Sequence, residues 1–371
     1  MTDVAGMLAV PAIYAAIVAL HLLLPARRVI GYVRDAAGRP LRYRLNGIAV
    51  LAVAMIVWAA LARTQLVAPD WLFRHRHGAA AGAAIVGVVF TLAVVLPLRR
   101  GAGGALAQLY LGRRENPQLL GGRIDLKMLL YLVGAVMLQL NLLSYAAHAG
   151  CVAPAARAGV MLHLGLFSAF VLDYLVFEHV HLYTYDLFAE RVGFKLGWGC
   201  LAFYPFFYAA GLATAVAHGP SATPTPALVA IATVFVGGWC LARGANLQKY
   251  HFKRDPQHRF LGLFTPVVIE DAGRRVLCSG FWGVSRHVNY LGEILMASAL
   301  AAALSWPPSW GGADGPLGWL ATLVPWSYPL YYVLLLVPRQ RDDDRRCRAK
   351  YGPLWDEYCR RVRWRIVPGL Y

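Results

Sequence analysis

Nine apolar segments limit what this chain can fold into. Each is close to the roughly 20 residues that an α-helix needs to cross about 30 Å of hydrocarbon. We therefore predict an all-α, polytopic integral membrane helix bundle of about 9–10 transmembrane helices, eight being the lower limit. Pro205 is expected to break the sixth helix. The segments are 4–24, 46–62, 78–97, 127–148, 157–178, 195–217, 226–242, 288–305 and 318–337.

Composition agrees with a membrane protein and argues against other classes. Of the 371 residues 58% are hydrophobic, and the mean hydropathy is +0.50, which soluble domains rarely reach. The net charge is +17, but the chain has no soluble domain large enough to gather it, so we expect no nucleic-acid partner. The six cysteines show no paired spacing, which favours reduced thiols over a disulfide framework or a metal site. The first apolar run lacks a basic segment before it and a cleavage site after it, so no cleavable signal is evident.

Basic residues gather in alternate loops between the segments. Of the 36 Lys and Arg residues, only Arg63, Arg74, Arg76 and Arg157 fall in the other set of loops. This asymmetry predicts a cytoplasmic C-terminus, in a bacterial inner membrane or the endoplasmic reticulum. It also predicts that the basic stretches around 249 and 345 lie on one side of the membrane, in contact with membrane lipids.

Lys249 and Lys253 are the first candidate binding residues. They are four residues apart at the cytoplasmic end of a predicted span, so both ammonium groups can converge on one phosphate. The alternative is an ordinary positive anchor at a helix end.

A second candidate set recurs every four residues near the C-terminus: Arg339, Asp343, Cys347 and Tyr351. On an α-helix such a row drifts only about 40° per step, so the four side chains share one face. Two opposite charges, a thiol and a phenol suit a polar ligand. The alternative is a solvated helix that holds anionic headgroups.

Aromatic and amide side chains lie just ahead of the eighth segment. Trp282 can stack on a planar ring, Asn289 can pair with a carboxamide or a ribose, and Tyr290 adds a phenol at the helix mouth. The alternative is an aromatic belt at the membrane interface.

Three acids lie within or just after the fifth segment: Asp173, Glu178 and Asp186. Carboxyl groups in an apolar helix are costly and usually functional. Burial raises a carboxyl pKa, so such a group can stay protonated near neutral pH and donate a proton. Glu178 is the preferred donor, although pairing with a basic neighbour would also explain Asp173 and Asp186.

Two blocks near the C-terminus carry a resemblance to a known family. The first reads CSGFWGVSRHVNYLGEIL from Cys278, and the second reads RQRDDDRRCRAKYGPLWDEYCRRVRWRIVPGLY from Arg339. They resemble the patterns SGWWGxxRHxNYxGD and RxxxDExxCxxKYGxxWxxYCxxVPxRIxPxxY. These belong to the Δ14/Δ7 sterol reductases of ergosterol biosynthesis, which include the membrane domain of the lamin B receptor. The loop entry Leu24-Pro25 to Asn46-Gly47 and the stretch around Glu178 are also similar to this family.

The resemblance implies NADPH as the cofactor, bound in the C-terminal half, and a sterol substrate from the bilayer. Lys253 stands where the family usually has Arg, and Cys200 where it often has Asp. The resemblance, taken together with the acid chemistry, implies that Glu178, Asp186 and Tyr290 are catalytic positions. Expected cofactor-binding positions are Lys249, Lys253, Leu277, Trp282, Asn289, Tyr290, Arg339, Asp343, Cys347, Tyr351 and Tyr358. No metal is expected.

The sequence thus predicts NADPH-dependent reduction of a sterol ring double bond by protonation and then hydride transfer. The Δ14 bond is the first choice and Δ7 the second. The helices at 1–225 would form an N-terminal part, and 226–371 would form the part that binds the cofactor. Two other classes remain open: an S-adenosylmethionine-dependent methyltransferase of the isoprenylcysteine carboxyl type, and a sterol-binding protein without catalysis.

Overall fold

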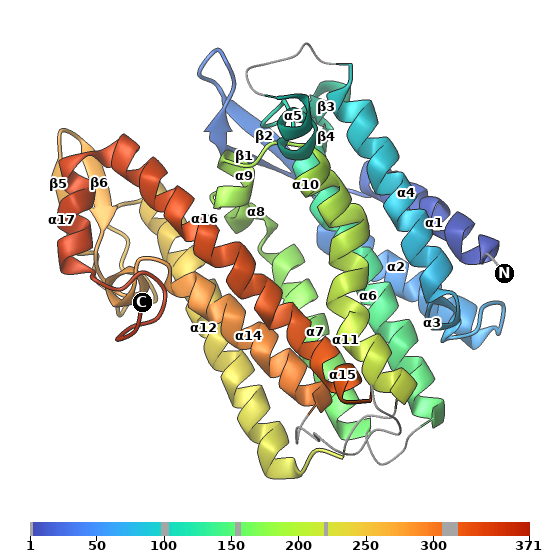
Figure 1. Cartoon of the computed structure of the whole chain (residues 1–371). Helices are drawn as coiled ribbons and strands as arrows, with labels where there is room; N and C mark the ends of the chain where they lie inside the picture. The colour runs from blue at the N-terminus through green and yellow to red at the C-terminus, as the bar shows by residue number, and fades with distance from the viewer. Residues whose placement is uncertain (1–2, 98–103, 153–156, 219–221, 306–317) are drawn as a thin grey trace. The chain divides into compact units, whose positions relative to one another are not determined.

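The computed structural model describes residues 3–97, 104–152, 157–218, 222–305 and 318–371 (Figure 1). The chain forms two compact units. The first consists of Met1–Ala222 with Ser309–Val324, and the second of Thr223–Pro308 with Pro325–Tyr371.

A buried helix organises the first unit. Helix α6 (Leu126–Val152) packs against α1, α2, α7 and α11 (Figure 1), and 83% of its apolar stretch is buried, against 28–44% for the other long helices of this unit. An apolar helix enclosed on all sides needs no polar face, and α6 has none over most of its length. The long helices of this unit around it are α1 (Val4–Leu23), α2 (Gly47–Arg63), α7 (Arg157–Val176) and α11 (Tyr204–His218), and α4 (Arg76–Val95) packs against α1.

Short elements connect these helices. The stretch between Pro25 and Asn46, which is similar to the family's loop entry, forms the hairpin β1 (Arg27–Arg34) and β2 (Pro40–Leu45), in which Val29 pairs with Tyr43. A second small ladder pairs β3 (Gln118–Leu119) with β4 (Ile124–Asp125). The remaining pieces are α3 (Trp71–Arg74), α5 (Ala105–Leu111), α8 (Glu178–His181), α9 (Tyr185–Phe188) and α15 (Gly318–Leu323).

The break expected near Pro205 is present. Helix α10 (Phe194–Trp198) passes through a π-helical turn, Gly199–Phe203, before α11 begins. Pro205 has no N–H to give to the Leu201 carbonyl four residues earlier, and the Tyr14 hydroxyl donates to that carbonyl instead. The break is therefore satisfied by a side chain from α1.

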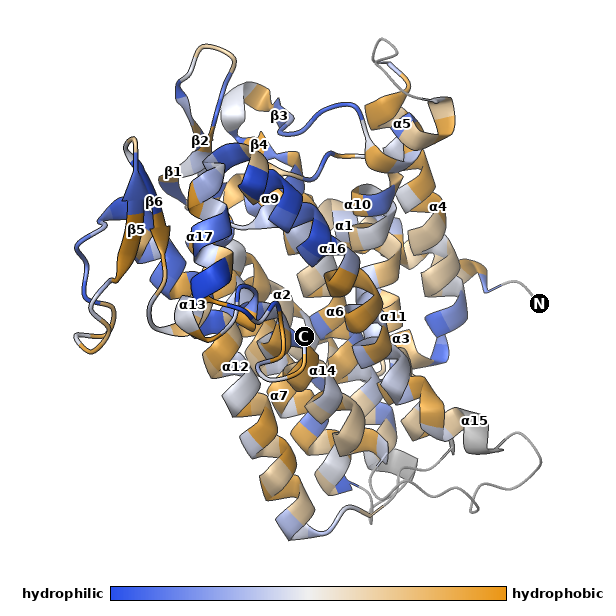
Figure 2. Cartoon of the chain, turned by 60° about the vertical axis from the view of Figure 1, so that its left-hand side comes forward, coloured by the Kyte–Doolittle hydropathy of each residue, from blue (hydrophilic) through white to orange (hydrophobic). Residues whose placement is uncertain are grey.

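The second unit contains three long helices and a small polar subdomain. The long helices are α12 (Thr225–Arg254), α14 (Val288–Ser305) and α16 (Ser327–Tyr351). The subdomain consists of the hairpin β5 (Val268–Asp271) and β6 (Arg274–Leu277), with α13 (Phe281–Val284) and α17 (Pro353–Arg361). Figure 2 shows apolar residues along the long helices and hydrophilic residues on β5, β6 and α17.

Helices α12 and α14 cross where each carries a glycine. A Cβ on Gly292 would lie 2.4 Å from the Gly238 carbonyl oxygen, and a Cβ on Gly238 would lie 2.7 Å from the Gly292 carbonyl. Small residues let helix backbones approach closely in a membrane. This crossing holds the Asn289–Tyr290 turn against the C-terminal half of α12.

The membrane-bundle prediction is confirmed, and the number of candidate spans is at the lower limit of the predicted range. Eight helices are long and apolar enough to cross a membrane in the part of the chain that the structure describes. The segment predicted at 46–62 is α2, which has 17 residues and is about 26 Å long at 1.5 Å per residue, below the usual length. No tenth span occurs among the described residues.

We expect Gly292→Ala to lower the thermal unfolding temperature of the detergent-purified protein, because the new methyl group forces α12 and α14 apart. Gly237→Ala is the matched control, since a Cβ at Gly237 meets nothing within 4 Å. Alanine is the better helix former by up to about 1 kcal/mol, so the control should be neutral or stabilising. Equal melting temperatures for the two variants would contradict the close crossing.

Candidate functional site

Helix α12 continues past its apolar part and carries both candidate lysines into the second unit's polar region. Lys253 Nζ donates to the Tyr351 hydroxyl at 3.2 Å, and Lys249 Nζ lies 5.6 Å from the Trp282 ring centroid. Lys249 also interacts electrostatically with Asp343 and Cys347. The two lysines thus face residues from the other candidate sets.

The predicted row on α16 forms one face of that helix. Arg339, Asp343, Cys347 and Tyr351 are all half-buried, whereas Arg341, Arg345, Arg346 and Arg348 are exposed. The helical spacing argument is therefore confirmed. Lys249 and Arg339 both act on the Asp343 carboxylate.

Gln248 shapes the turn that carries Trp282. Its side-chain oxygen accepts from the Phe281 N–H at 3.0 Å, and its nitrogen donates to the Ser279 carbonyl at 3.2 Å. Gly280 has φ +62°, and a Cβ there would lie 2.3 Å from Gln248 Nε2, so only glycine fits. Gln248 is 2% exposed and was not among the predicted site residues.

Trp282 is fixed at both ends. Its indole Nε1 donates to the Ala245 carbonyl at 2.9 Å, and its own carbonyl accepts from the Tyr358 hydroxyl at 2.8 Å. Tyr358 is 2% exposed, and burial raises the pKa of its phenol, so the hydroxyl stays protonated as a donor. The indole face beside Lys249 is held in position without any ligand.

Asn289 and Tyr290 lie at the start of α14. Asn289 Nδ2 donates to Asn246 Oδ1 at 3.4 Å. Asn289 Oδ1 is buried and accepts no hydrogen bond from any described residue. Buried polar atoms are usually paired, so this oxygen is available to a ligand N–H. Tyr290 stacks on the His287 ring, with centroids 5.1 Å apart.

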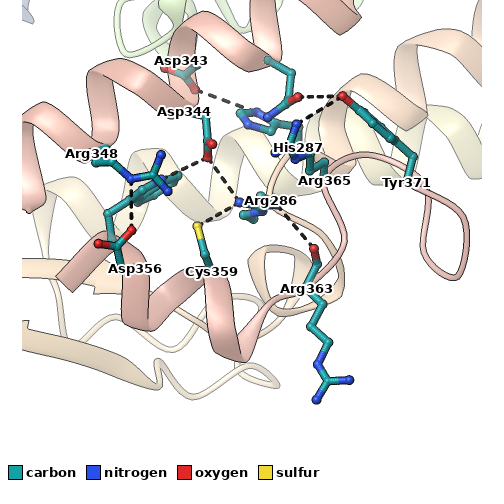
Figure 3. A network of polar contacts seen from close by, with 12 residues as sticks. Arg286, His287, Asp343, Asp344, Arg348, Asp356, Cys359, Arg363, Arg365 and Tyr371 are labelled. Atoms are coloured by element: carbon teal, nitrogen blue, oxygen red, sulfur yellow. Dashed lines mark hydrogen bonds and ion pairs between the residues drawn. The ribbon is translucent and has the colours of Figure 1, made fainter. Parts of the chain in front are cut away.

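A buried ion pair joins this turn to α16. Arg286 donates to Asp344 at 3.3 Å, and the two side chains are 8% and 10% exposed. Asp344 also accepts from the Trp355 indole at 3.0 Å, and Arg286 donates to Cys359 Sγ at 2.8 Å. Figure 3 shows Asp344, Cys359 and Arg286 converging from α16, α17 and the loop before α14, respectively.

The C-terminal tail closes over the same loop. The backbone N–H groups of Arg286 and His287 donate to the carbonyls of Trp364 and Arg365 at 3.0 and 2.8 Å. The Ser285 hydroxyl donates to the Ile366 carbonyl at 2.9 Å. The last residues are therefore part of the site's scaffold.

His287 is neutral in this setting. Burial, followed by the nearby cations Lys249, Arg286 and Arg365, lowers its pKa to about 3. Its Nδ1 lies 3.8 Å from an Asp343 oxygen, a contact that is not an ion pair while the imidazole is uncharged.

Several predicted cofactor residues pack in an apolar cluster between the β5–β6 hairpin and α17. Tyr358 belongs to its buried core, with Trp355. Cys347 and Tyr351 pack against its edge, and Leu277 is 7% exposed at the end of β6.

In the first unit, Glu178 binds the start of a helix. Its carboxylate accepts from the Gly47 N–H at 3.1 Å, at the first residue of α2, and it is 7% exposed. A Cβ on Gly47 would lie 2.6 Å from the carboxylate, which explains the glycine of the Asn46-Gly47 pair. Burial raises the pKa of Glu178 to about 7, although the Gly47 hydrogen bond lowers it.

The other two candidate acids, Asp173 and Asp186, are half-buried, and both have polar partners. The Asp186 and Leu187 carbonyls accept from Lys127 Nζ at 3.2 and 2.8 Å, and Lys127 is fully buried. Asp173 lies on α7, five residues before Glu178. Cys200 is buried in the π-helical turn.

Comparison with known proteins identifies the family. The model of the "Ergosterol biosynthesis ERG4/ERG24 family" matches residues 7–371. The chain belongs to this family.

Relatives of the chain in the ERG4/ERG24 family come from plants, animals and fungi. A protein of Arabidopsis thaliana named Delta(14)-sterol reductase is 32% identical over 361 residues, which cover 94% of this chain and 91% of the relative. The Delta(14)-sterol reductase TM7SF2 of Mus musculus is 32% identical over 95% of this chain and 82% of its own length. The Delta(14)-sterol reductase of Septoria lycopersici is 30% identical over 95% of this chain and 78% of its own.

Within this ERG4/ERG24 chain, the structure brings most predicted cofactor residues together in the second unit and places the acids Glu178 and Asp186 in the first. Sequence reasoning missed Gln248, Asp344 and Trp355. Asp344 follows Asp343 directly and lies about 100° further around the helix, so the four-residue spacing did not select it. Its buried partners, Arg286 58 residues earlier and Trp355 11 residues later, distinguish it.

We expect Asp344→Leu or Arg286→Met alone to cost about 3–5 kcal/mol of unfolding free energy, because each leaves a buried charge without its partner. The double variant should lose clearly less unfolding free energy than the sum of the two single losses. The measurement is thermal unfolding of the detergent-purified protein. Arg345→Ala is the control: its partner Asp342 and Arg345 itself are more exposed, so little should change. Additive losses would show that the pair does not act as a unit.

Proposed function

We propose that this chain is a sterol reductase that saturates the Δ14 double bond with NADPH. The observation that carries the proposal is the near-full-length similarity to proteins of plant, animal and fungus that bear the same name, Delta(14)-sterol reductase. The fold supports it, because a sterol reaches a helix bundle through the bilayer.

The chemistry sets what the side chains must do. An isolated ring alkene is not electrophilic, so a proton must first convert it to a tertiary carbocation. NADPH, when bound, supplies the hydride that quenches this cation. The protein must therefore provide an acid and a dry environment in which water does not capture the cation.

Glu178 is the proposed acid. A carboxyl with a pKa near 7 is about half protonated at neutral pH and can both release and recover a proton. Its Oε2 accepts from the Gly47 N–H, and its Oε1 takes no part in that hydrogen bond. Asp186 and Tyr290 are the second choices, as relay and phenol donors.

The second unit supplies the groups that NADPH requires. Lys249 and Lys253 would hold phosphate oxygens, with Arg339 adding a third cation. Trp282 would stack on a ring, the unpaired Asn289 Oδ1 would accept from a carboxamide, and Asp343 and Tyr351 would bind hydroxyl groups. Cys347 and Tyr358 lie in or beside the apolar cluster, and Leu277 is buried at the end of β6; we propose that all three shape this surface.

We further propose that the C-terminal basic region faces the cytoplasm, where NADPH is found. The distribution of Lys and Arg between alternate loops supports this orientation.

The direct test is to incubate purified protein with NADPH and Δ14-, Δ7- or Δ24(28)-unsaturated sterols and to identify the products by mass. We expect a gain of two hydrogens on the Δ14 sterol and at least tenfold slower turnover of the others. Faster reduction of the Δ7 sterol would move the assignment to that bond. Methyl transfer from S-adenosylmethionine without NADPH oxidation would replace it with another activity.

We expect Glu178→Gln to reduce kcat by at least 100-fold and to leave NADPH binding unchanged, in line with the usual contribution of a general acid. The glutamine oxygen can still accept from Gly47, so the fold is kept. Because the protonated form is active, the wild-type rate should be flat below pH 7 and fall about tenfold per pH unit well above it. Asp173→Asn is the control. Full activity of Glu178→Gln would refute the acid assignment.

We expect Lys249→Ala to raise the KM for NADPH about 10- to 100-fold with a smaller change in kcat, because about 1.5–3 kcal/mol is lost with one charged hydrogen bond. Arg274→Ala removes an exposed charge from the same unit and should leave KM unchanged. A KM for NADPH that does not change in Lys249→Ala would remove this residue from the phosphate site.

A further inference from the structure

A cavity of about 650 Å³ lies beside the β1–β2 hairpin of the first unit, and none of the residues assigned a role above lines it. Five arginines line it, with one carboxylate: Arg28, Arg39, Arg42, Arg44, Arg123 and Asp35. Its volume is within the range of small-molecule sites.

The strand register places three of these arginines on one face. Arg28 pairs with Arg44 and Ile30 with Arg42, while the alternate pair, Val29 and Tyr43, faces the core, where Tyr43 is 1% exposed. Like charges directly opposite each other across a ladder destabilise a hairpin. An anion between them would remove that cost.

The protein itself supplies little negative charge here. The Asp35 carboxylate already accepts from Arg39 Nε at 3.0 Å and from the backbone N–H groups of Ala37 and Arg39. Arg44 Nε donates to the His21 carbonyl at 3.2 Å, and Arg123 donates to the Leu22 carbonyl at 3.3 Å. Arg28 and Arg42 are exposed and have no acceptor among the described residues.

The cavity also lies at the end of a span. Helix α1 ends at Leu23, β1 begins at Arg27, and the carbonyls that Arg44 and Arg123 bind belong to the last turn of α1 and the residue after it. Phospholipid phosphates lie at this depth, and basic pockets at helix ends bind anionic headgroups. Guanidinium groups suit phosphate because they can form two parallel hydrogen bonds.

We propose that this cavity binds a phosphate ester, with Arg28 and Arg42 as its principal ligands and the headgroup of an anionic phospholipid as its source. Arg44 and Arg123 anchor the site to the end of α1 through their hydrogen bonds to its last carbonyls. The site is independent of the reductase activity.

The test is native mass spectrometry of the purified full chain with equal amounts of phosphatidylglycerol and phosphatidylcholine. We expect retained phosphatidylglycerol to exceed phosphatidylcholine at least fivefold, and Arg28→Gln and Arg42→Gln each to abolish this excess. Arg27→Gln is the matched control: it removes the same charge one residue away, on the opposite face of the strand and outside the cavity. Thermal unfolding of each variant establishes that it is folded.

Three outcomes would overturn the proposal or change the source. An equal loss in Arg27→Gln would mean attraction by net charge alone, and no preference for phosphatidylglycerol would mean no site. A soluble competitor, sn-glycerol 3-phosphate, separates the sources. Retention of the lipid against millimolar competitor supports a headgroup, whereas displacement at micromolar concentration overturns the lipid assignment in favour of a soluble phosphate ester.

Discussion

The buried pair of Arg286 and Asp344 is the contact on which the second unit's polar region depends. Two charges at most 10% exposed must stay together, because either alone would bear an uncompensated desolvation cost. The pair fixes the loop before α14 against α16, and Asp344 also holds the Trp355 indole, which packs on Tyr358 in α17. Tyr358 in turn donates to the Trp282 carbonyl. A chain of contacts therefore runs from one ion pair to the aromatic ring beside Lys249.

Glu178 illustrates a different compromise in the first unit. Its carboxylate caps α2 through Gly47, which favours the charged form, yet burial outweighs that bond and raises the pKa to about 7. The folded state thus binds more protons than the unfolded chain between about pH 4.5 and 7, so this residue's contribution to stability falls as the pH rises through that window. A group that costs stability when ionised is suited to hold a proton for use elsewhere. In the proposed reaction that proton goes to the sterol.

Much of this structure follows from local patterns in the sequence. Hydropathy located every long helix that the described residues form, Pro205 marked the π-helical turn, and four-residue spacing placed Arg339 to Tyr351 on one face of α16. Contacts distant in sequence could not be predicted this way. Gly47 and Glu178 are 131 residues apart, and nothing local in either segment reveals the other. Gln248 looked like any polar residue at a helix end, because its role depends on the positive φ of Gly280, 32 positions later.

Isotope tracing tests the central chemical claim most directly. Purified protein is supplied with a Δ14 sterol and either deuterated NADPH in water or ordinary NADPH in heavy water, and the product is analysed by mass and NMR. We predict one deuterium from the cofactor on the more substituted alkene carbon, where the cation forms, and one from the solvent on its neighbour. Both hydrogens from solvent, or the cofactor hydrogen on the less substituted carbon, would contradict protonation followed by hydride transfer.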